Sequence, residues 1–417
     1  MSSLVIEGGR PLRGAVGVVG AKNAVLKEMA AMLLAPGRYR LFNVPKILDV
    51  DLMGRVLSHM GAHVEIGEGE LSVVIPAKVT PTAPIELVRT MRASIVVLGP
   101  LVARCGEARV ALPGGDDLGA RPIDIHMGGL EQMGVEFDLV HGELIARCER
   151  LVGAEIELKF PSVGATENVL LAACVAEGET SIINAAREPE IEDLADFLNA
   201  MGARVSGAGS AIIHVEGVES LHSADHSVVP DRLEAGTFAV GAAITGGDVT
   251  VTACNPPHLR VELKKLEEAG CRVERGEGWL RVVGPEKPRP VDFATLPYPG
   301  FHTDMQPQMV ALLSVADGTS VVTENLYDAR FRYMGELARM GADISTEWQH
   351  AVIRGVKELS GCQVLAHDIR AGAALVLAGL RAEGVTVVGD CEHIDRGYDH
   401  FVEKLESLGA EIERRDT

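Results

Sequence analysis

The segment LSHMGAHVE, at residues 57–65, is the first of six related phrases in this chain. Each phrase has an amphipathic stretch, then a glycine, then a hydrophobic residue two or three places on. The other five read LEQMGVEF (130–137), LNAMGARV (198–205), LEEAGCRVE (266–274), LARMGADI (337–344) and LESLGAEIE (405–413). Successive phrase glycines lie 68 to 73 residues apart. Self-similarity at a steady period indicates a chain built from structural repeats.

A second series of glycines runs in step with the first: Gly37, Gly106, Gly178, Gly247, Gly318 and Gly384. Each follows a small-residue helical stretch, such as NAVLKEMAAMLLAPG at 23–37, and precedes a β-branched run, such as TSIIN at 180–184. Because glycine adopts a positive φ without strain, a glycine just past a helix is its usual C-cap. The repeat is therefore predicted to run helix, glycine, strand, turn, helix, glycine, strand. The alternative is an ordinary α/β chain with frequent helix–glycine–strand joins, although a chance alignment of two series of six is improbable.

Length and composition favour a compact α/β protein of two or three domains. The chain has 417 residues, of which 47% are apolar, and this is too hydrophobic for a disordered chain. Its formal net charge of −20 argues against non-specific nucleic-acid binding, which needs a basic face. The charge does not exclude a small anionic ligand, because a few arginines make a positive site in an acidic protein.

Targeting and cysteine patterns indicate a reduced, soluble, cytoplasmic protein. The N-terminal MSSLVIEGG lacks the basic and apolar regions of a signal peptide. The longest apolar stretches, such as 93–103, are shorter than the roughly 20 residues of a membrane span. The seven cysteines include no C-x-x-C pair, so neither a disulfide framework nor a zinc site is expected. We therefore expect no membrane partner.

Residues that are neither ordinary core nor ordinary surface recur at two points of the repeat. At or just before the first helix are Lys22-Asn23, Arg92, Ser162-Val163-Gly164, Asp231-Arg232, Asp304 and Arg370. Between the strand and the second helix are Asp116-Asp117, Arg121, Arg330 and Asp395-Arg396. Helix N-termini carry free N–H groups and a positive dipole end, so together with Lys and Arg they are predicted to bind phosphate and carboxylate groups. Taken singly, each Arg also fits a solvated surface residue and each Asp an N-cap.

The loop LPGGDDLG, residues 112–119, combines two glycines with two acids. This composition is typical of a mobile active-site lid, and the alternative is a plain turn. The sequence contains no G-x-G-x-x-G after a strand, no G-x-x-x-x-G-K-[ST], no G-x-S-x-G and no H-E-x-x-H. His302 and His393 lie beside site candidates and are interpreted as hydrogen-bonding neighbours rather than ligands.

Seven segments resemble the UDP-N-acetylglucosamine 1-carboxyvinyltransferases, the MurA group of the enolpyruvyl transferases. They are GAKNA (20–24), MRASIVVLGPLVAR (91–104), LPGGDDLGARPIDIH (112–126), SVGATENVLLAA (162–173), AAREPEI (185–191), YPGFHTDMQPQ (298–308) and HIDRGY (393–398). The resemblance covers the whole chain and implies two domains, each an inside-out α/β barrel of three repeats with the helices inside. We predict one domain at 22–229 and the other at 1–21 with 230–417, with an active site in the cleft between them.

The resemblance implies transfer of the enolpyruvyl group of phosphoenolpyruvate to the 3′-hydroxyl of UDP-N-acetylglucosamine, the first committed step of peptidoglycan biosynthesis, without metal or organic cofactor. Residues implied to bind phosphoenolpyruvate are Lys22, Asn23, Arg121, Arg330, Arg370 and Arg396. Residues implied to line the UDP-sugar are Asn23, Arg92, Arg121, Pro122, Ile123, Asp124, Ser162, Val163, Gly164, Asp304 and Leu326. By the same likeness Asp304 is the base that meets the sugar hydroxyl, while Lys22 and Arg396 stabilise charge during catalysis.

Two positions depart from the pattern of the family. Most relatives carry Cys, and a minority Asp, at the loop position of Asp116, which we predict to be the acid that protonates the methylene carbon. Turnover should then be insensitive to the epoxide fosfomycin, which alkylates the loop thiol; the nearest cysteine, Cys105, is expected to be packed in a helix–strand join. Phe160 stands where many relatives have a diphosphate-contacting Lys, and Lys159 is the candidate substitute.

Two other functions stay open. One is an enolpyruvyl transferase that acts on another acceptor. The other, from a different class, is a catalytically silent relative that binds a UDP-sugar in regulation. The presence of Lys22, Arg121, Asp304 and Arg396 argues against the second.

Overall fold

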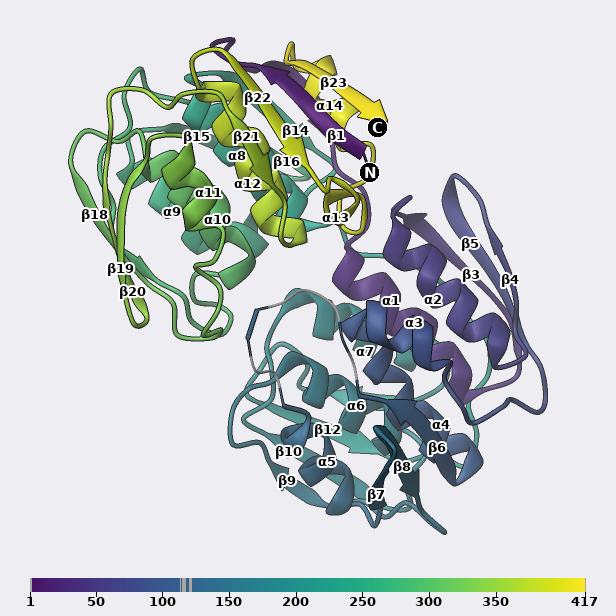
Figure 1. The fold of residues 1–417 in the computed structure, drawn as a ribbon. Helices are drawn as coiled ribbons and strands as arrows, with labels where there is room; N and C mark the ends of the chain where they lie inside the picture. The colour runs from purple at the N-terminus through teal and green to yellow at the C-terminus, as the bar shows by residue number, and fades with distance from the viewer. Residues whose placement is uncertain (1, 113, 115–117, 120–121, 417) are drawn as a thin grey trace. The chain divides into compact units, whose positions relative to one another are not determined.

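The computed structural model describes residues 2–112, 114, 118–119 and 122–416 (Figure 1). The chain splits into two units. Unit 1 consists of Met1–Val19, Asp117–Arg121 and Pro230–Thr417, and unit 2 of Gly20–Asp116 and Pro122–Val229. Among the described residues, no helix is both long enough and apolar enough to cross a lipid bilayer.

Unit 2 contains three small sheets. Its elements are α1 (Lys22–Ala31), η1 (Met32–Leu34), β3 (Gly37–Val44), α2 (Leu48–His59), β4 (His63–Ile66), β5 (Gly69–Ile75), α3 (Ile85–Thr90), η2 (Arg92–Val97), α4 (Leu98–Cys105), β6 (Glu107–Ala111), α5 (Asp124–Glu131), β7 (Glu136–Val140), β8 (Glu143–Arg147), β9 (Glu155–Glu157), α6 (Val163–Ala173), β10 (Glu179–Ile183), α7 (Pro189–Ala200), β11 (Arg204–Ser206), β12 (Ile212–Glu216) and β13 (Asp225–Ser227). The sheet orders are β13-β3-β5-β4, β6-β8-β7 and β11-β12-β10-β9.

Unit 1 repeats this plan. Its elements are β1 (Ser2–Glu7), β2 (Arg13–Gly17), α8 (Arg232–Thr245), β14 (Asp248–Thr252), η3 (Pro256–Leu259), α9 (Arg260–Glu268), β15 (Arg272–Gly276), β16 (Trp279–Val283), β17 (Phe293–Ala294), η4 (Thr303–Met305), α10 (Gln306–Leu313), β18 (Thr319–Thr323), α11 (Met334–Arg339), β19 (Asp343–Glu347), β20 (His350–Arg354), β21 (Gln363–Leu365), α12 (Ile369–Arg381), β22 (Val385–Gly389), α13 (Glu392–Asp395), α14 (Phe401–Ser407) and β23 (Glu411–Asp416). The sheet orders are β15-β16-β14-β2, β17-β18-β20-β19 and β21-β22-β1-β23.

The first helices of the repeats are buried on nearly every side. In α8, every residue from Arg232 to Ile244 is buried, and in α12 every residue from Ile369 to Leu380. A helix that is apolar all round belongs in a core, and α8, α10 and α12 pack on one another inside unit 1 (Figure 1). The second helices, such as α9, bury only one face. This confirms the predicted inside-out arrangement of six helix–strand repeats.

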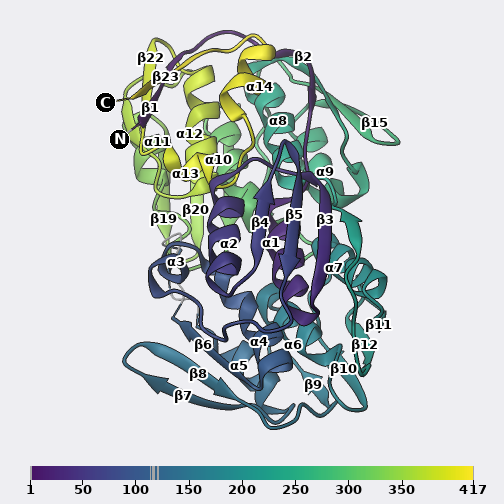
Figure 2. The same cartoon turned by 90° about the vertical axis from the view of Figure 1, so that its right-hand side faces the viewer.

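The last repeat takes one strand from the start of the chain. Strand β1 inserts between β22 and β23 and is antiparallel to both, and Ser2 pairs with Asp416 (Figure 2). Strand β2 runs parallel to β14 in a different sheet of the same unit. Residues 2–17 therefore complete two sheets of unit 1.

Backbone angles explain the two glycine series. The phrase glycines, from Gly61 to Gly409, all have φ between +92° and +103°, a region that favours glycine. In the second series the C-cap prediction is correct for Gly106, which ends α4 with φ +69°. It is wrong for Gly247, because Gly246 ends α8 with φ +63°. Gly37 instead opens β3, three residues after η1 ends.

Candidate functional site

The polar residues of the first predicted set lie at the N-terminal ends of the inner helices. Helix α1 begins at Lys22 and η2 begins at Arg92, while Asp304 lies in η4 just before α10. Ser162 caps α6, where its hydroxyl accepts a hydrogen bond from the amide of Ala165. The remaining two positions belong to unit 1. There Asp231 caps α8 and Arg370 is the second residue of α12.

In unit 1, Asp304 lies between two buried arginines. Its Oδ1 is 3.1 Å from Arg330 Nη2, and its Oδ2 is 3.3 Å from Arg370 Nε. Burial alone would raise the pKa of Asp304, but Arg330 and Arg370 together hold it well below its usual value. In this state Asp304 is a charged and weakly basic carboxylate.

Both arginines keep unused donors. Arg330 is 2% exposed and Arg370 3%, yet Arg330 Nε and Arg370 Nη1 have no hydrogen-bond partner among the described residues. A buried guanidinium N–H without a partner is costly, and an anionic oxygen would satisfy it. The two donors of this Asp304–Arg330–Arg370 cluster therefore suit a carboxylate or phosphate oxygen.

Neighbouring residues fix this cluster, and the sequence did not identify them. Asp368 caps α12 through the amides of Arg370 and Ala371, both at 2.8 Å, and its Oδ1 lies 3.8 Å from Arg330 Nη1. The Arg370 guanidinium lies 5.0 Å from the ring centroid of Tyr398. The sequence could have indicated Asp368, because an Asp two residues before Arg370 fits a helix N-cap. It could not have indicated Tyr398, which lies near Arg370 only in the folded chain.

The second predicted set is partly described. Leu326 and Arg396 are half-buried, and the Leu326 amide donates to Glu324 at 2.9 Å. Glu324 also accepts from Thr303 at 3.0 Å, which ties this turn to the residue before Asp304. Asp395, in contrast, is held by Arg414 at 2.6 and 2.8 Å, so it serves the fold.

In unit 2, Lys22 forms an ion pair that the sequence did not predict. Its Nζ lies 2.8 Å from Asp49 Oδ2, and the side chains are 11% and 1% exposed. A second buried pair joins the inner helices, because Lys27 Nζ lies 2.9 Å from Glu167 Oε1 and 3.2 Å from the carbonyl of Asn23. Burial raises the pKa of Glu167 to about 7, although Lys27 opposes the shift.

The segments 122–126 and 162–164 meet at His126. A Cβ at Gly164 would lie 2.8 Å from His126 Cε1, so a close approach requires glycine there. His126 Nδ1 lies 2.9 Å from the Asn168 side-chain amide nitrogen, a donor, so the ring is neutral with its proton on Nε2. Burial, aided by Arg92 and Lys27, lowers the pKa of His126 to about 4.

Other UDP-sugar candidates lie around this contact. Pro122 and Asp124 are exposed, Ile123 is buried, and Asn23, Arg92, Ser162 and Val163 are half-buried. Lys159 is exposed. It is the candidate substitute for the diphosphate-contacting lysine that many relatives have at the position of Phe160. The structure therefore brings 122–126 and 162–164 together, and it leaves the Lys159 substitution a prediction.

The acid that the sequence predicts belongs to the loop at 112–119. Asp116, Asp117 and Arg121 lie outside the described residues, so the predicted acid stays a prediction. Leu118 belongs to unit 1, where its carbonyl accepts from the amide of Ala329 at 3.3 Å. The expectation for Cys105 is wrong: this thiol is exposed at the last residue of α4, past Val102 where the buried residues of the helix end.

Known proteins match this chain along nearly its whole length. Residues 6–405 match the family EPSP synthase (3-phosphoshikimate 1-carboxyvinyltransferase). The chain is 54% identical over 412 residues to the UDP-N-acetylglucosamine 1-carboxyvinyltransferase of Corynebacterium jeikeium, covering 99% of both chains. The identity to the Mycobacterium tuberculosis enzyme of that name is 54% over 410 residues, covering 98% of both.

Solved structures share the fold. The enolpyruvyl transferase NikO from Streptomyces tendae superimposes with a TM-score of 0.91 at 26% identity, covering 100% of this chain and 99% of that one. EPSP synthase from Acinetobacter baumannii superimposes with a TM-score of 0.76 at 22% identity, covering 100% of both, which supports the fold alone. With the family match and the full-length relatives, the chain belongs to the enolpyruvyl transferase family, in the branch of the UDP-N-acetylglucosamine 1-carboxyvinyltransferases.

Proposed function

We propose that this chain transfers the enolpyruvyl group of phosphoenolpyruvate to the 3′-hydroxyl of UDP-N-acetylglucosamine and releases phosphate. The observation that carries the proposal is the 54% identity to enzymes of that name along nearly the full length of both chains. The reaction is the first committed step of peptidoglycan biosynthesis, and the proposal includes the cytoplasmic location that the resemblance implies.

The arginine cluster supports binding of phosphoenolpyruvate. The unpartnered Arg330 Nε and Arg370 Nη1 are donors for its carboxylate and phosphate oxygens. Lys22, Asn23, Arg121 and Arg396 complete the proposed set. Its lysine and arginines would oppose the negative charge that develops as phosphate leaves.

The helix N-termini of unit 2 support binding of the UDP-sugar. The first turns of η2 and α6, at Arg92 and at Ser162–Gly164, present backbone N–H groups suited to diphosphate oxygens. The segment Pro122–Asp124 leads into α5, which carries His126 against Gly164. From unit 1, Asp304 and Leu326 are proposed to meet the sugar.

The chemistry is addition followed by elimination. The sugar oxygen attacks the substituted carbon of phosphoenolpyruvate and loses its proton to Asp304, while Asp116 protonates the methylene carbon. The tetrahedral intermediate then returns that methyl proton to Asp116 and expels phosphate, which restores the double bond. Because phosphoenolpyruvate would bring negative charge beside Arg330 and Arg370, its binding would offset part of the positive charge that depresses the basicity of Asp304.

A phosphate-release assay tests this function. The expected result is phosphate release only when phosphoenolpyruvate and UDP-N-acetylglucosamine are both present, with a product heavier than the sugar nucleotide by one enolpyruvyl group in mass spectrometry. Release with 3-phosphoshikimate but not with the sugar nucleotide would assign another acceptor. Saturable binding of the sugar nucleotide without any release would identify the catalytically silent relative.

A further inference from the structure

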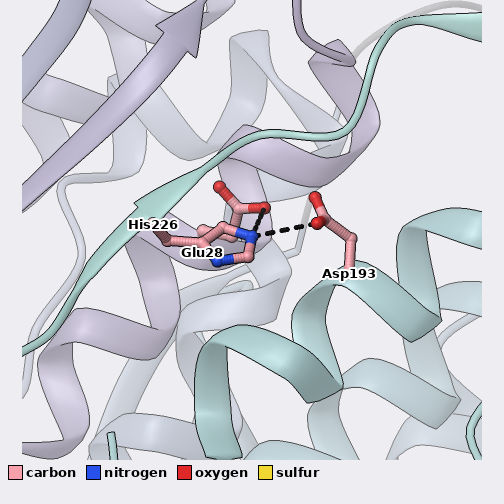
Figure 3. A group of neighbouring side chains, drawn as sticks. All are labelled: Glu28, Asp193 and His226. Atoms are coloured by element: carbon pink, nitrogen blue, oxygen red, sulfur yellow. Dashed lines mark hydrogen bonds and ion pairs between the residues drawn. The ribbon is translucent and has the colours of Figure 1, made fainter. Parts of the chain in front are cut away.

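Three potential ligands gather in unit 2 apart from the residues assigned to substrates. They are Glu28 of α1, Asp193 of α7 and His226 of β13, and one ligand atom from each lies within 4.8 Å of the other two (Figure 3). His226 Nε2 is 2.9 Å from Asp193 Oδ1 and 3.7 Å from Glu28 Oε1. Ligand atoms bound to one zinc ion at about 2.0–2.2 Å in a tetrahedron lie roughly 3.3–3.6 Å apart.

Glu28 is the unusual member of this group. Its side chain is 0% exposed, and neither of its oxygens accepts a hydrogen bond from a described N–H or hydroxyl donor; its one hydrogen-bonding neighbour among the described residues is the carboxyl group of Asp193. Burial, followed by the negative charge of Asp193, raises the pKa of Glu28 well above its usual value. Two facing buried acids are destabilising unless a shared proton or a cation joins them, and His226 supplies a third ligand atom for a cation.

We propose that Glu28, Asp193 and His226 bind one divalent transition-metal ion, with Zn²⁺ as the best match, and that water completes its coordination. One imidazole nitrogen with carboxylate oxygens is a donor set that suits Zn²⁺ and related ions. The three residues stand 165 and 33 positions apart in the sequence, so no ligand motif reveals them.

Neighbouring groups already orient two of the ligands. The Val229 amide donates to Asp193 Oδ2 at 2.9 Å, which leaves Oδ1 toward His226. The ring of Phe197 lies 5.4 Å from the His226 ring, centroid to centroid. Such supporting contacts are usual around metal ligands. The ion would join α1, α7 and β13, and its role would be to stabilise unit 2 rather than to take part in enolpyruvyl transfer.

Titration of the chelator-treated full-length protein tests the site. Co²⁺, followed by visible absorbance, and Zn²⁺, followed by calorimetry, should each bind with one equivalent per chain. Zn²⁺ should also raise the melting temperature. Glu28→Gln and His226→Gln should each weaken binding at least about tenfold. The matched control is His63→Gln, which removes an exposed imidazole that contacts Glu65 at 3.0 Å and should bind the metal as wild type does.

The unmodified protein and the matched control together decide the proposal. The proposal is overturned if the wild-type protein shows no saturable binding, if Glu28→Gln binds as tightly as wild type, or if His63→Gln loses binding equally. Should Glu28→Gln fail to fold, the wild-type titration and His226→Gln still decide.

Discussion

At the scale of single residues, the site is defined by buried charges whose partners come from distant parts of the chain. Lys22 contacts Asp49, and Asp304 contacts Arg330 and Arg370. The position of Lys22, Asp304 and Arg370 within the sequence repeat predicted that they lie at helix N-termini. It could not predict their partners, because these contacts depend on how inner helices and loops pack.

Replacing Lys22 should separate stability from catalysis. Lys22→Ala should lose most turnover and should also destabilise the fold, by at most about 3–5 kcal/mol, because it removes one ion pair of the buried Asp49 carboxylate. Adding Asp49→Asn should restore much of the melting temperature but none of the turnover. If the double variant turns over like wild type, Lys22 does not act on the substrate.

Asp116 determines the expected response to fosfomycin. A carboxylate is a weaker nucleophile than a thiolate, so wild-type turnover should be insensitive to the drug. Asp116→Cys should keep activity, gain sensitivity and shift the pH optimum upward, because a thiol stays protonated to higher pH. Asp116→Asn should lose most activity, since an amide cannot donate the proton.

Two measurements check the role of Asp116. Asp117→Asn is the matched control and should be nearly silent in the turnover assay. Mass spectrometry of fosfomycin-treated wild type should show no covalent addition to residues 112–119, and the exposed Cys105 should be examined in the same digest. Normal turnover by Asp116→Asn would mean that another group protonates the methylene carbon.

His126 should make stability depend on pH. Its folded pKa of about 4 lies below the ordinary value of 6.5. The contribution of the neutral ring to the free energy of unfolding is therefore fully present above about pH 6.5. It amounts to roughly 3 kcal/mol and is lost as the pH falls toward 4. Chemical unfolding of wild type and His126→Gln across this range should show their difference shrinking with falling pH. A constant difference would mean that His126 is not buried in its neutral form.

At the scale of elements, the two glycine series predicted the repeats because each phrase glycine adopts the same positive φ. The prediction was less successful for helix ends. Gly246, not Gly247, caps α8, and two adjacent glycines cannot be told apart from sequence alone. Cys105 was misplaced because helical spacing does not show where the core ends along α4.

Two glycines of one repeat allow a direct test of this backbone argument. Gly341 has φ +92°, and a Cβ added there would meet no other group within 4 Å, so Gly341→Ala should destabilise by about 1–2 kcal/mol through backbone strain alone. Gly335 has equally open space but lies within α11, so Gly335→Ala should be neutral or stabilise by about 0.5–1 kcal/mol. Urea unfolding of both variants compares them; equal effects would show that φ is not the cause.

At the scale of the whole molecule, the sequence predicted six repeats and the resemblance predicted how they divide. The order of strands within each sheet could not be predicted, because it depends on long-range pairing. Local patterns likewise do not show that β13 joins β3 or that β1 joins β22 and β23. The metal-ligand candidates were missed for the same reason.

Substrate binding should be coupled. If UDP-N-acetylglucosamine binds first, calorimetry should show phosphoenolpyruvate binding at least about fivefold more tightly when the sugar nucleotide is present. By thermodynamic linkage, phosphoenolpyruvate should improve sugar-nucleotide binding by the same factor. Lys78→Ala, which changes an exposed residue, is the control and should leave the coupling unchanged. If phosphoenolpyruvate binds equally tightly with and without the sugar nucleotide, the two substrates are not coupled.

The pairing of β1 with β22 and β23 has a consequence for synthesis on the ribosome. Ser2 emerges 414 residues before its partner Asp416. At about 5–20 residues per second, the first strand waits roughly 20–80 s for its neighbours. All of unit 2 has been translated by residue 229, long before that pairing is possible. A nascent chain released before β22 and β23 are made therefore exposes an unpaired β1, which makes premature termination a hazard for aggregation.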